Sequence, residues 1–324
     1  MRASAFIVAA LLLTNPVPSS ADQRYALIVS GAAGGPEYVA QYDRWSTQLS
    51  KALIEALKFD PARVTVLSDT SRPADVATAE NVRRVITSIA SRMTRDDVFF
   101  ILLIGHGTFD GTDAKFNLVG PDLESADWSA LLKAVPGRAI LVNTSSASFP
   151  FLERLSGSRR VIITATDSPA QRYDTVFPEY FIRALTDPGA DLDKNERVSI
   201  WEAFAAASSA VRRHYQQRGQ LSTEHALLDD NGDKTGSADP STNGPDGKVA
   251  SLLAIGSAAD AAALPSDPKL RALVLEQREL EHRVESLRLL KESMDPAKYQ
   301  SELEKLVTDL ALKTREIRSL EGAK

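Results

Sequence analysis

Hydrophobic positions follow two different patterns along the first two-thirds of the chain. Short, continuous apolar runs predict strands at residues 25–30, 63–68, 98–104, 139–142 and 161–165. Apolar side chains at intervals of three and four residues predict helices at residues 40–57, 80–93, 178–185 and 200–217. Continuous apolar runs are typical of parallel strands that are covered on both faces. The alternation therefore predicts an α/β domain with an open, mostly parallel sheet and helices on both faces.

The first residues match a signal peptide rather than a part of this fold. Arg2 precedes an apolar run over residues 5–13, which is too short for a membrane-spanning helix of about 20 residues. Small residues at Ser19 and Ala21 place cleavage after Ala21, so residues 1–21 are interpreted as a signal peptide. An uncleaved interfacial anchor is the alternative. We expect a periplasmic or secreted protein with no membrane span after cleavage.

The remaining chain divides into three parts. Residues 22–230 form the expected α/β domain, and residues 231–267 are rich in Gly, Ser, Pro, Asp and Asn, which is typical of a linker. Over residues 268–324, apolar positions recur at three- and four-residue spacing, with an interruption at Pro296 and a charged residue, Lys313, within the series. This spacing predicts a helical hairpin or coiled coil. Self-association, a partner helix and packing against the α/β domain are all open interpretations of it.

Composition narrows the possible chemistry. The sequence contains no Cys, which excludes disulfides, thiolate metal sites and a cysteine nucleophile. Its 38 basic and 43 acidic residues give a net charge of −5, so no nucleic-acid partner is expected. The four histidines are scattered and lack the spacing of a zinc site.

Unusual residues follow several of the predicted strands, at the edge where open α/β sheets bind ligands. The first strand leads into a glycine-rich stretch, residues 31–35, which contains no phosphate-binding motif and is better interpreted as a tight turn. His106 follows the third strand between two glycines, which leaves its imidazole open to solvent. Ser145 follows the fourth strand within a run of hydroxyl residues. Arg172 follows the fifth strand and is a candidate for lining the same cleft.

Two stretches, DVFFILLIGHG at residues 97–107 and AILVNTS at residues 139–145, resemble the caspase and legumain peptidases (clan CD, C13/C14-type). In that family, a histidine after one hydrophobic strand and a cysteine after the next are the catalytic pair. The resemblance covers roughly residues 24–230 and implies a caspase-like three-layer α/β/α fold. It assigns His106 the role of general base, Ser145 the position of the nucleophilic cysteine, and N–H groups near Gly107 and Ser145 the oxyanion site. It also implies a peptide or protein ligand in the cleft.

Serine in the cysteine position changes what such a site can do. A thiol with a pKa of about 8.5 can be held as a thiolate by a neighbouring imidazolium, whereas a serine hydroxyl needs a base that a carboxylate orients. Asp110 and Asp113 follow His106 closely and are candidates for that carboxylate. We therefore prefer a pseudoprotease or altered protease that uses its cleft for binding. The alternatives are an active Ser–His peptidase and a coiled-coil assembly or scaffold protein.

A second pattern is independent of the peptidase question. Oxygen ligands occupy positions 1, 3, 5, 7, 9 and 12 of a loop with EF-hand calcium spacing. These residues are Asp191, Asp193, Asn195, Arg197 (through its backbone carbonyl), Ser199 and Glu202. Glu196 stands where an EF-hand has glycine, so an acidic loop with helix-capping aspartates is the alternative to a Ca²⁺ site. Residues 229–233 also gather acidic side chains, for which a turn is preferred over a metal site. No other cofactor is expected.

Overall fold

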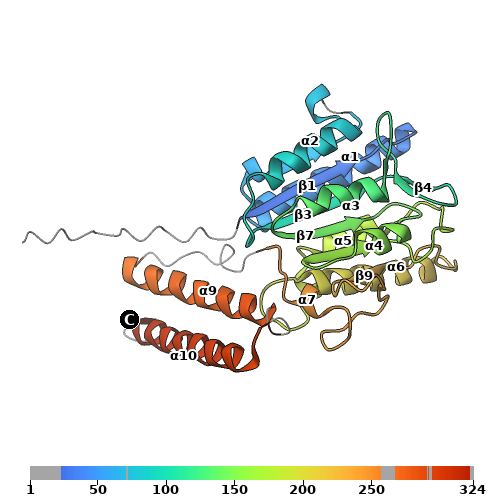
Figure 1. Cartoon of the computed structure of the whole chain (residues 1–324). Helices are drawn as coiled ribbons and strands as arrows, with labels where there is room; N and C mark the ends of the chain where they lie inside the picture. The colour runs from blue at the N-terminus through green and yellow to red at the C-terminus, as the bar shows by residue number, and fades with distance from the viewer. Residues whose placement is uncertain (1–22, 71, 257–266, 290, 292–293, 322–324) are drawn as a thin grey trace, which may run out of the picture.

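The computed structural model of the chain describes residues 23–70, 72–256, 267–289, 291 and 294–321. The predicted signal peptide lies outside these residues. A six-stranded sheet forms the centre of the α/β domain, in the order β2-β1-β3-β7-β8-β9 (Figure 1). Its strands are β1 (Arg24–Ser30), β2 (Val64–Leu67), β3 (Val98–Ile104), β7 (Arg138–Asn143), β8 (Arg160–Thr164) and β9 (Leu227–Asp229).

The five predicted strands are all present and all pair in parallel. Ile28 of β1 lies opposite Val66 on one side and Leu102 on the other, and Leu102 lies opposite Val142 of β7. The sixth strand, β9, pairs antiparallel with β8 at the edge of the sheet. The sequence pattern leaves the existence of this short edge strand open. Because the other five strands are parallel, their carboxyl ends meet at one edge, which we call the carboxyl edge.

Helices cover both faces of the sheet, since alternate side chains of each strand point to opposite faces. Ile28 and Leu102 pack into one apolar layer, and Leu27 and Leu103 into the other. The first layer contains α1 (Pro36–Lys51) with its π-helical extension (Ala52–Ala56), α5 (Phe177–Ala184), α6 (Ile200–Gln217) and α7 (Lys248–Ser251). The second layer contains α2 (Ala79–Ala90), α3 (Ser125–Lys133) and α4 (Phe149–Leu155). The predicted three-layer α/β/α architecture is confirmed.

Several short elements have no counterpart in the sequence pattern. A small antiparallel sheet contains β4 (Gly107–Phe109), β5 (Ala114–Phe116) and β6 (Leu123–Glu124). Single 3-10 turns lie at Pro61–Arg63, Pro73–Asp75 and Pro188–Ala190. Helices α3 and α4 are only 9 and 7 residues long, which is too short for a clear helical period to emerge.

The segment after β9 is mostly irregular, as its composition predicts, but part of it packs against the α/β domain. Leu228 and Ser237 form an isolated bridge, and Ile200 at the start of α6 donates its N–H to the Leu253 carbonyl at 2.8 Å. Ala250 and Ile255 are buried in the same apolar layer as α6. Residues 231–256 therefore extend the first helical layer. The last residues of the predicted linker, 257–266, lie outside the described part of the chain.

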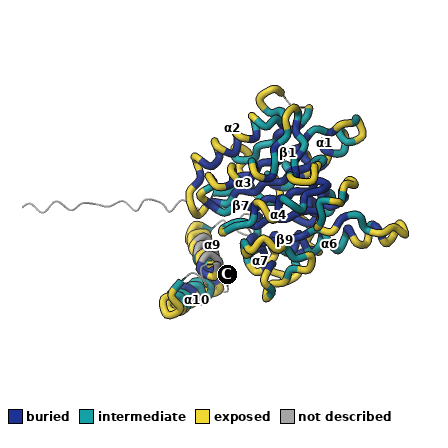
Figure 2. Tube along the Cα trace, turned by 45° about the vertical axis from the view of Figure 1, so that its right-hand side comes forward, coloured by how far each residue is buried: buried dark blue, intermediate teal, exposed yellow. Residues whose placement is uncertain are grey.

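Two long helices follow, α9 (Pro268–Leu289) and α10 (Pro296–Glu321), and they lie side by side below the α/β domain in Figure 1. Val284, Leu287 and Leu306 are the buried centre of this pair. Most of the described residues of this pair are exposed or half-buried, whereas the strands of the sheet are mostly buried (Figure 2). Within the described residues, no helix combines the length and the apolar character that crossing a membrane requires.

Candidate functional site

His106 lies at the carboxyl edge, directly after β3, and three segments hold its imidazole. The hydroxyl of Tyr42 on α1 lies 3.2 Å from Nε2, and the carbonyl oxygen of Ala33 lies 3.1 Å from the same atom. On the opposite side of the ring, Asp174 Oδ1 lies 3.3 Å from Nδ1. Gly105, the residue before His106, has a φ of +155°, a backbone conformation that residues with a side chain rarely adopt. The imidazole is thus held on both ring nitrogens.

The carboxylate that faces His106 is Asp174, not Asp110 or Asp113. Asp110 pairs with Lys115 at 3.4 Å, and Asp113 with Arg154 at 3.9 Å. Asp174 precedes α5 and also accepts a hydrogen bond from the Tyr38 hydroxyl. That hydrogen bond raises the pKa of Tyr38. The interpretation of Asp110 or Asp113 as the orienting carboxylate is therefore wrong in this structure.

Two tyrosines of α1 complete the surroundings of the imidazole. The ring of Tyr38 packs edge-on against His106 with 4.7 Å between ring centroids. Burial raises the pKa of Tyr42, and the negative charge of Asp174 adds to this effect, so the Tyr42 hydroxyl keeps its proton. Neither tyrosine belongs to the candidates that the sequence suggests. Their spacing of four residues places them on one helix face, but nothing in that spacing points to His106.

Ser145 lies beside Gly107, the residue that follows His106, and is fully buried. Its hydroxyl donates to Oδ1 of Asn143 at 2.7 Å, and its backbone N–H donates to the same oxygen at 3.0 Å. Among the described residues, no hydrogen bond joins Ser145 to His106. The structure thus places both predicted residues at one edge of the sheet and directs the serine hydroxyl toward Asn143.

The two backbone groups expected to form an oxyanion site are already paired. The N–H of Gly107 lies 3.3 Å from Ser146 Oγ, and the N–H of Ser145 donates to Asn143. The chain is also tightly packed here, because a Cβ on Gly107 would lie 2.1 Å from the Ser146 carbonyl oxygen and 2.6 Å from Ser145 Oγ. An incoming carbonyl group would have to displace these contacts.

A loop between β8 and α5, residues 165–176, covers this part of the edge. The Ala147 N–H donates to the Gln171 carbonyl at 2.7 Å, and the Thr175 hydroxyl donates to the Thr144 carbonyl. The buried carboxylate of Glu224 accepts the N–H groups of Val176 and Phe177, which fixes the end of the loop at the start of α5. Together these bonds hold the loop down over the chain that follows β7.

The enclosed space under this loop is small. A cavity of about 10 Å³ lies between α1, the loop and the ends of the strands. Its lining residues include Tyr38, Tyr42, Thr144, Asp174 and Thr175. That volume is close to the space of one water molecule and far below that of a peptide side chain. In this conformation the cavity is too small for a peptide side chain, whereas the side chains of His106 and Asp174 stay partly exposed, at 26% and 52%.

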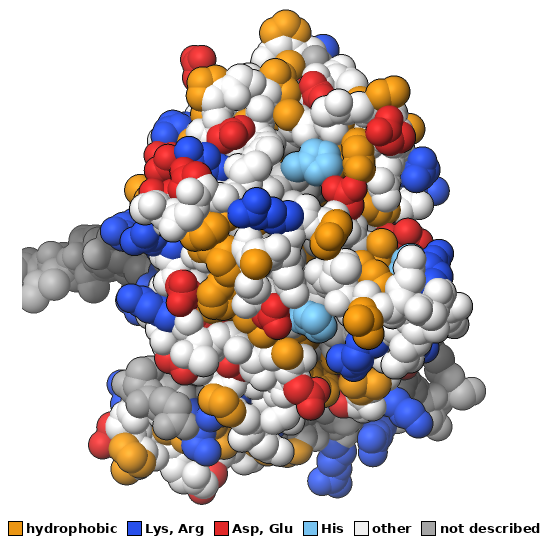
Figure 3. All heavy atoms as spheres, turned by 90° about the vertical axis from the view of Figure 1, so that its right-hand side faces the viewer, with side chains coloured by type: hydrophobic (Ala, Val, Ile, Leu, Met, Phe, Trp, Pro, Cys, Tyr) orange, Lys and Arg blue, Asp and Glu red, His pale blue; other side chains and the backbone are white. Residues whose placement is uncertain are grey.

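Arg172 lies on the outer surface of this loop. It is exposed, and its neighbour Tyr173 is 71% exposed. Figure 3 looks onto the side of the molecule on which β4 lies in Figure 1, and histidine side chains are visible there among hydrophobic and charged ones. The prediction that Arg172 shares an edge with His106 agrees with the position of its loop, which carries Asp174 to the imidazole.

The predicted calcium loop brings three carboxylates together. Oxygen atoms of Asp191, Asp193 and Glu202 lie within 4.8 Å of one another. Glu196 has a φ of +66°, the left-handed region in which the EF-hand loop uses glycine. Burial raises the pKa of Asp193, and the charges of Glu202 and Asp191 add to this effect. A divalent cation would relieve this repulsion.

Hydrogen bonds within the same loop also support the capping interpretation. Asp191 accepts the N–H groups of Asn195 and Glu196, and the Arg197 N–H donates to the side chain of Asn195. Ser199 and Glu202 form a capping box at the start of α6. The loop is therefore folded by its own polar groups, and calcium binding stays a prediction.

The second acidic cluster, at the end of β9, is bound to backbone N–H groups. Asp230 accepts from Gly247 at 3.0 Å and from Ala250 at 2.7 Å, while Asp229 accepts from Gly232 at 2.8 Å. Asp246 is buried beside them, and burial, together with the charges of its acidic neighbours, raises its pKa to about 7. The local bond between Asp229 and Gly232 supports the interpretation of residues 229–233 as a turn, while the two bonds of Asp230 attach this segment to the start of α7.

Comparisons with known proteins give a likeness of architecture alone. No family model matches the chain, and no curated protein matches it. Among solved structures, protein GSU0716 from Geobacter sulfurreducens aligns with a TM-score of 0.43 and 14% identity, over 64% of this chain and 93% of that one. Caspase-1 from Spodoptera frugiperda aligns with a TM-score of 0.44 and 11% identity, over 64% of this chain and 86% of that one.

Proposed function

We propose that this chain is an exported, caspase/legumain-like protein that does not hydrolyse peptides and instead binds a peptide or protein at its carboxyl edge. The observation that carries the proposal is the state of Ser145, which is buried and bonded to Asn143. A serine nucleophile needs contact with its base and access to the substrate carbonyl. Two observations speak against both requirements: Ser145 is fully buried, and both nitrogens of His106 face other groups.

The outer surface of this edge supports the binding role. Tyr173 and Leu221 are large side chains that are 71% and 91% exposed. They lie on two loops, before α5 and after α6, which a 3.0 Å hydrogen bond between Gln171 and His225 joins. Exposed Arg172 lies next to Tyr173, and these two residue types are enriched where binding energy concentrates in interfaces. Such a surface suits a peptide or protein segment with apolar and acidic side chains.

An active Ser–His peptidase is the second candidate, and one observation favours it. Asp174 lies 3.3 Å from Nδ1 of His106, which is the relation that an orienting carboxylate has to a catalytic base. Catalysis would require the Ser145 hydroxyl to exchange Asn143 for His106. It would also require the loop before α5 to move away from the chain that follows β7.

Hydrolysis is tested with the unaltered protein and the variants Ser145→Ala, Ser145→Cys and His106→Ala on a broad fluorogenic peptide library. We expect no turnover by the unaltered protein and no labelling of Ser145 by a fluorophosphonate. Turnover that disappears in both Ser145→Ala and His106→Ala would overturn the proposal and establish the second candidate. Activity in Ser145→Cys alone would agree with an unaltered protein that does not hydrolyse peptides, but it would overturn the argument from burial, because it would show that only the nucleophile is lacking.

Binding is tested by selection of displayed peptides on the purified protein. We expect enriched sequences that bind the double variant Arg172→Ala/Tyr173→Ala at least tenfold more weakly. Lys133→Ala, an exposed change on α3 at the other helical layer, is the matched control and should bind normally. Equal binding by the double variant and the control would exclude this surface.

A further inference from the structure

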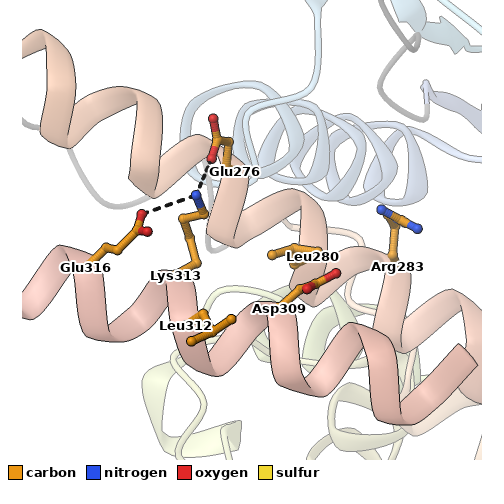
Figure 4. A pocket seen from close by; sticks show the side chains of 7 residues that line it. All are labelled: Glu276, Leu280, Arg283, Asp309, Leu312, Lys313 and Glu316. Atoms are coloured by element: carbon orange, nitrogen blue, oxygen red, sulfur yellow. Dashed lines mark hydrogen bonds and ion pairs between the residues drawn. The ribbon is translucent and has the colours of Figure 1, made fainter.

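The pair of C-terminal helices has a groove on one side that nothing in the described chain fills. The groove has a volume of about 610 Å³ and runs between α9 and α10 (Figure 4). Leu280 and Leu312 line it, and Leu312 is 55% exposed. Arg283 and Asp309 also line it, on α9 and α10 respectively. An apolar floor with charged rims is the usual arrangement of a helix–helix contact surface.

The helix pair has little apolar core of its own. Within its described residues, five apolar side chains are less than 10% exposed: Leu270, Val284, Leu287, Leu306 and Ile317. The two helices are 22 and 26 residues long, so each extends for about 33–39 Å at a rise of about 1.5 Å per residue. Antiparallel helices of this length commonly pair again to form four-helix bundles, which bury the side that a single pair leaves open.

Lys313 lines one end of the groove and forms two ion pairs there. Its ammonium group lies 2.7 Å from Glu276 on α9 and 3.3 Å from Glu316 on α10 (Figure 4). These ion pairs explain how a lysine can occupy the apolar series of α10. At the other end of the groove, no ion pair is formed by Arg283 or Asp309 with any described residue. Both side chains line the groove, so their opposite charges can meet a partner that enters it.

We propose that a second copy of this chain occupies the groove, so that two helix pairs form an antiparallel four-helix bundle in which Arg283 of each copy faces Asp309 of the other. A two-fold axis along the helices produces this contact, because it lays α9 of one copy over α10 of the next. Residues 266–324 contain twelve basic and twelve acidic residues, so two copies carry no net repulsion. The axis also makes every adjacent helix antiparallel, which favours the helix dipoles.

The test is the molar mass of the whole protein in solution, measured by sedimentation at 1–100 µM as an order-of-magnitude range set by typical dimer affinities. We expect a dimer that dissociates at least tenfold more readily in the variants Arg283→Glu and Asp309→Arg. The double variant restores the opposite charges and should restore the dimer. Arg288→Glu is the matched control, since Arg288 is exposed on α9 and does not line the groove.

Each other outcome contradicts the proposal. A monomer over the whole concentration range would exclude the second copy. A dimer that resists both single variants would place the interface elsewhere, and dissociation that the double variant does not reverse would exclude the facing pair. Circular dichroism of every variant separates a lost interface from a helix pair that fails to fold.

Discussion

His106 connects three parts of the chain that are distant in sequence. Its ring nitrogens contact Ala33 after β1, Tyr42 on α1 and Asp174 before α5. In a hydrolase the same imidazole would have one nitrogen directed at a nucleophile. Here that position is taken by a carbonyl and a tyrosine hydroxyl. At the scale of single residues, His106 therefore links the loop between β8 and α5 to α1 and to the chain that follows β1.

The sequence could identify His106 and Ser145 but not their partners. Both follow strongly apolar strands, and the topology of a parallel sheet brings such positions to one edge. Asp174 lies in a loop 68 positions after His106, and no local pattern marks it among 43 acidic residues. The bond between Ser145 and Asn143 depends on side-chain orientation, which spacing does not determine. The hydrogen-bond partners of His106 and Ser145 therefore followed from the structure alone.

Asp246 gives a prediction about pH. Burial raises its pKa from 3.8 to about 7, with the charges of Asp229, Asp230 and Asp233 adding to the shift. Because the folded chain then binds a proton that the unfolded chain has lost, its stability falls as pH rises between these two values. We expect Asp246→Asn to remove part of this slope and to raise the free energy of unfolding above pH 7, by up to about 4 kcal/mol.

Urea unfolding of the unaltered protein and of Asp246→Asn at pH 5, 6, 7 and 8 measures how the free energy of unfolding depends on pH. Asparagine retains the oxygen that accepts the Asp230 N–H, so the variant keeps that contact. Asp239→Asn, an exposed change in the same segment, serves as the control and should follow the unaltered protein. Equal slopes in Asp246→Asn and the unaltered protein would show that this carboxyl does not carry the effect.

At the scale of elements, long periodic segments were predictable and short ones were not. The strand at 98–104 and the helix at 200–217 match β3 and α6 residue for residue, because each offers enough positions for its period to be read. Strands β4, β5 and β6 have three residues or fewer, so their formation depends on tertiary contacts rather than on a local pattern. Composition indicated loop for residues 231–256, and their backbone is largely irregular. Ala250 and Ile255 are buried because they pack in the same apolar layer as α6, and composition does not indicate such a contact.

The acidic loop before α6 carries the prediction of calcium binding. Three carboxylates within 4.8 Å repel one another, and a bound cation would remove that repulsion. We expect calcium to raise the melting temperature, and chelator to reverse the change, because binding to the folded state alone stabilises by about 1.4 kcal/mol at ten times Kd. Asp193→Asn removes one ligand without touching the Ser199–Glu202 capping box, so its response to calcium should be much smaller.

Magnesium at the same concentration is the ionic control, since it prefers smaller octahedral sites with several waters. An unaltered protein whose melting temperature is the same with calcium and with chelator would leave the loop as a helix cap. In that case Asp193→Asn should slightly stabilise the protein, because it removes a carboxylate that Glu202 and Asp191 repel.

At the scale of the whole molecule, two proposed contact surfaces lie on different parts of the chain. The carboxyl edge with Arg172 and Tyr173 belongs to the α/β domain, and the groove belongs to the helix pair that follows it (Figure 1). If both proposals hold, a dimer through the helices would carry two carboxyl edges. Paired sites raise avidity without any new contact, provided that both can reach the ligand.

The predicted export concerns the whole molecule and depends on residues 1–21. Cleavage after Ala21 would leave Gln23, whose N–H donates to Asp97 at 2.6 Å and whose carbonyl accepts from Val98, so β1 would keep these contacts. We expect a Gram-negative host to release a product that begins at Asp22, as intact mass and N-terminal sequencing would show. Ala21→Arg, which blocks the small-residue site, should leave the precursor uncleaved. If a host that expresses the unaltered protein kept it at full length in the cytoplasmic fraction, this would contradict export.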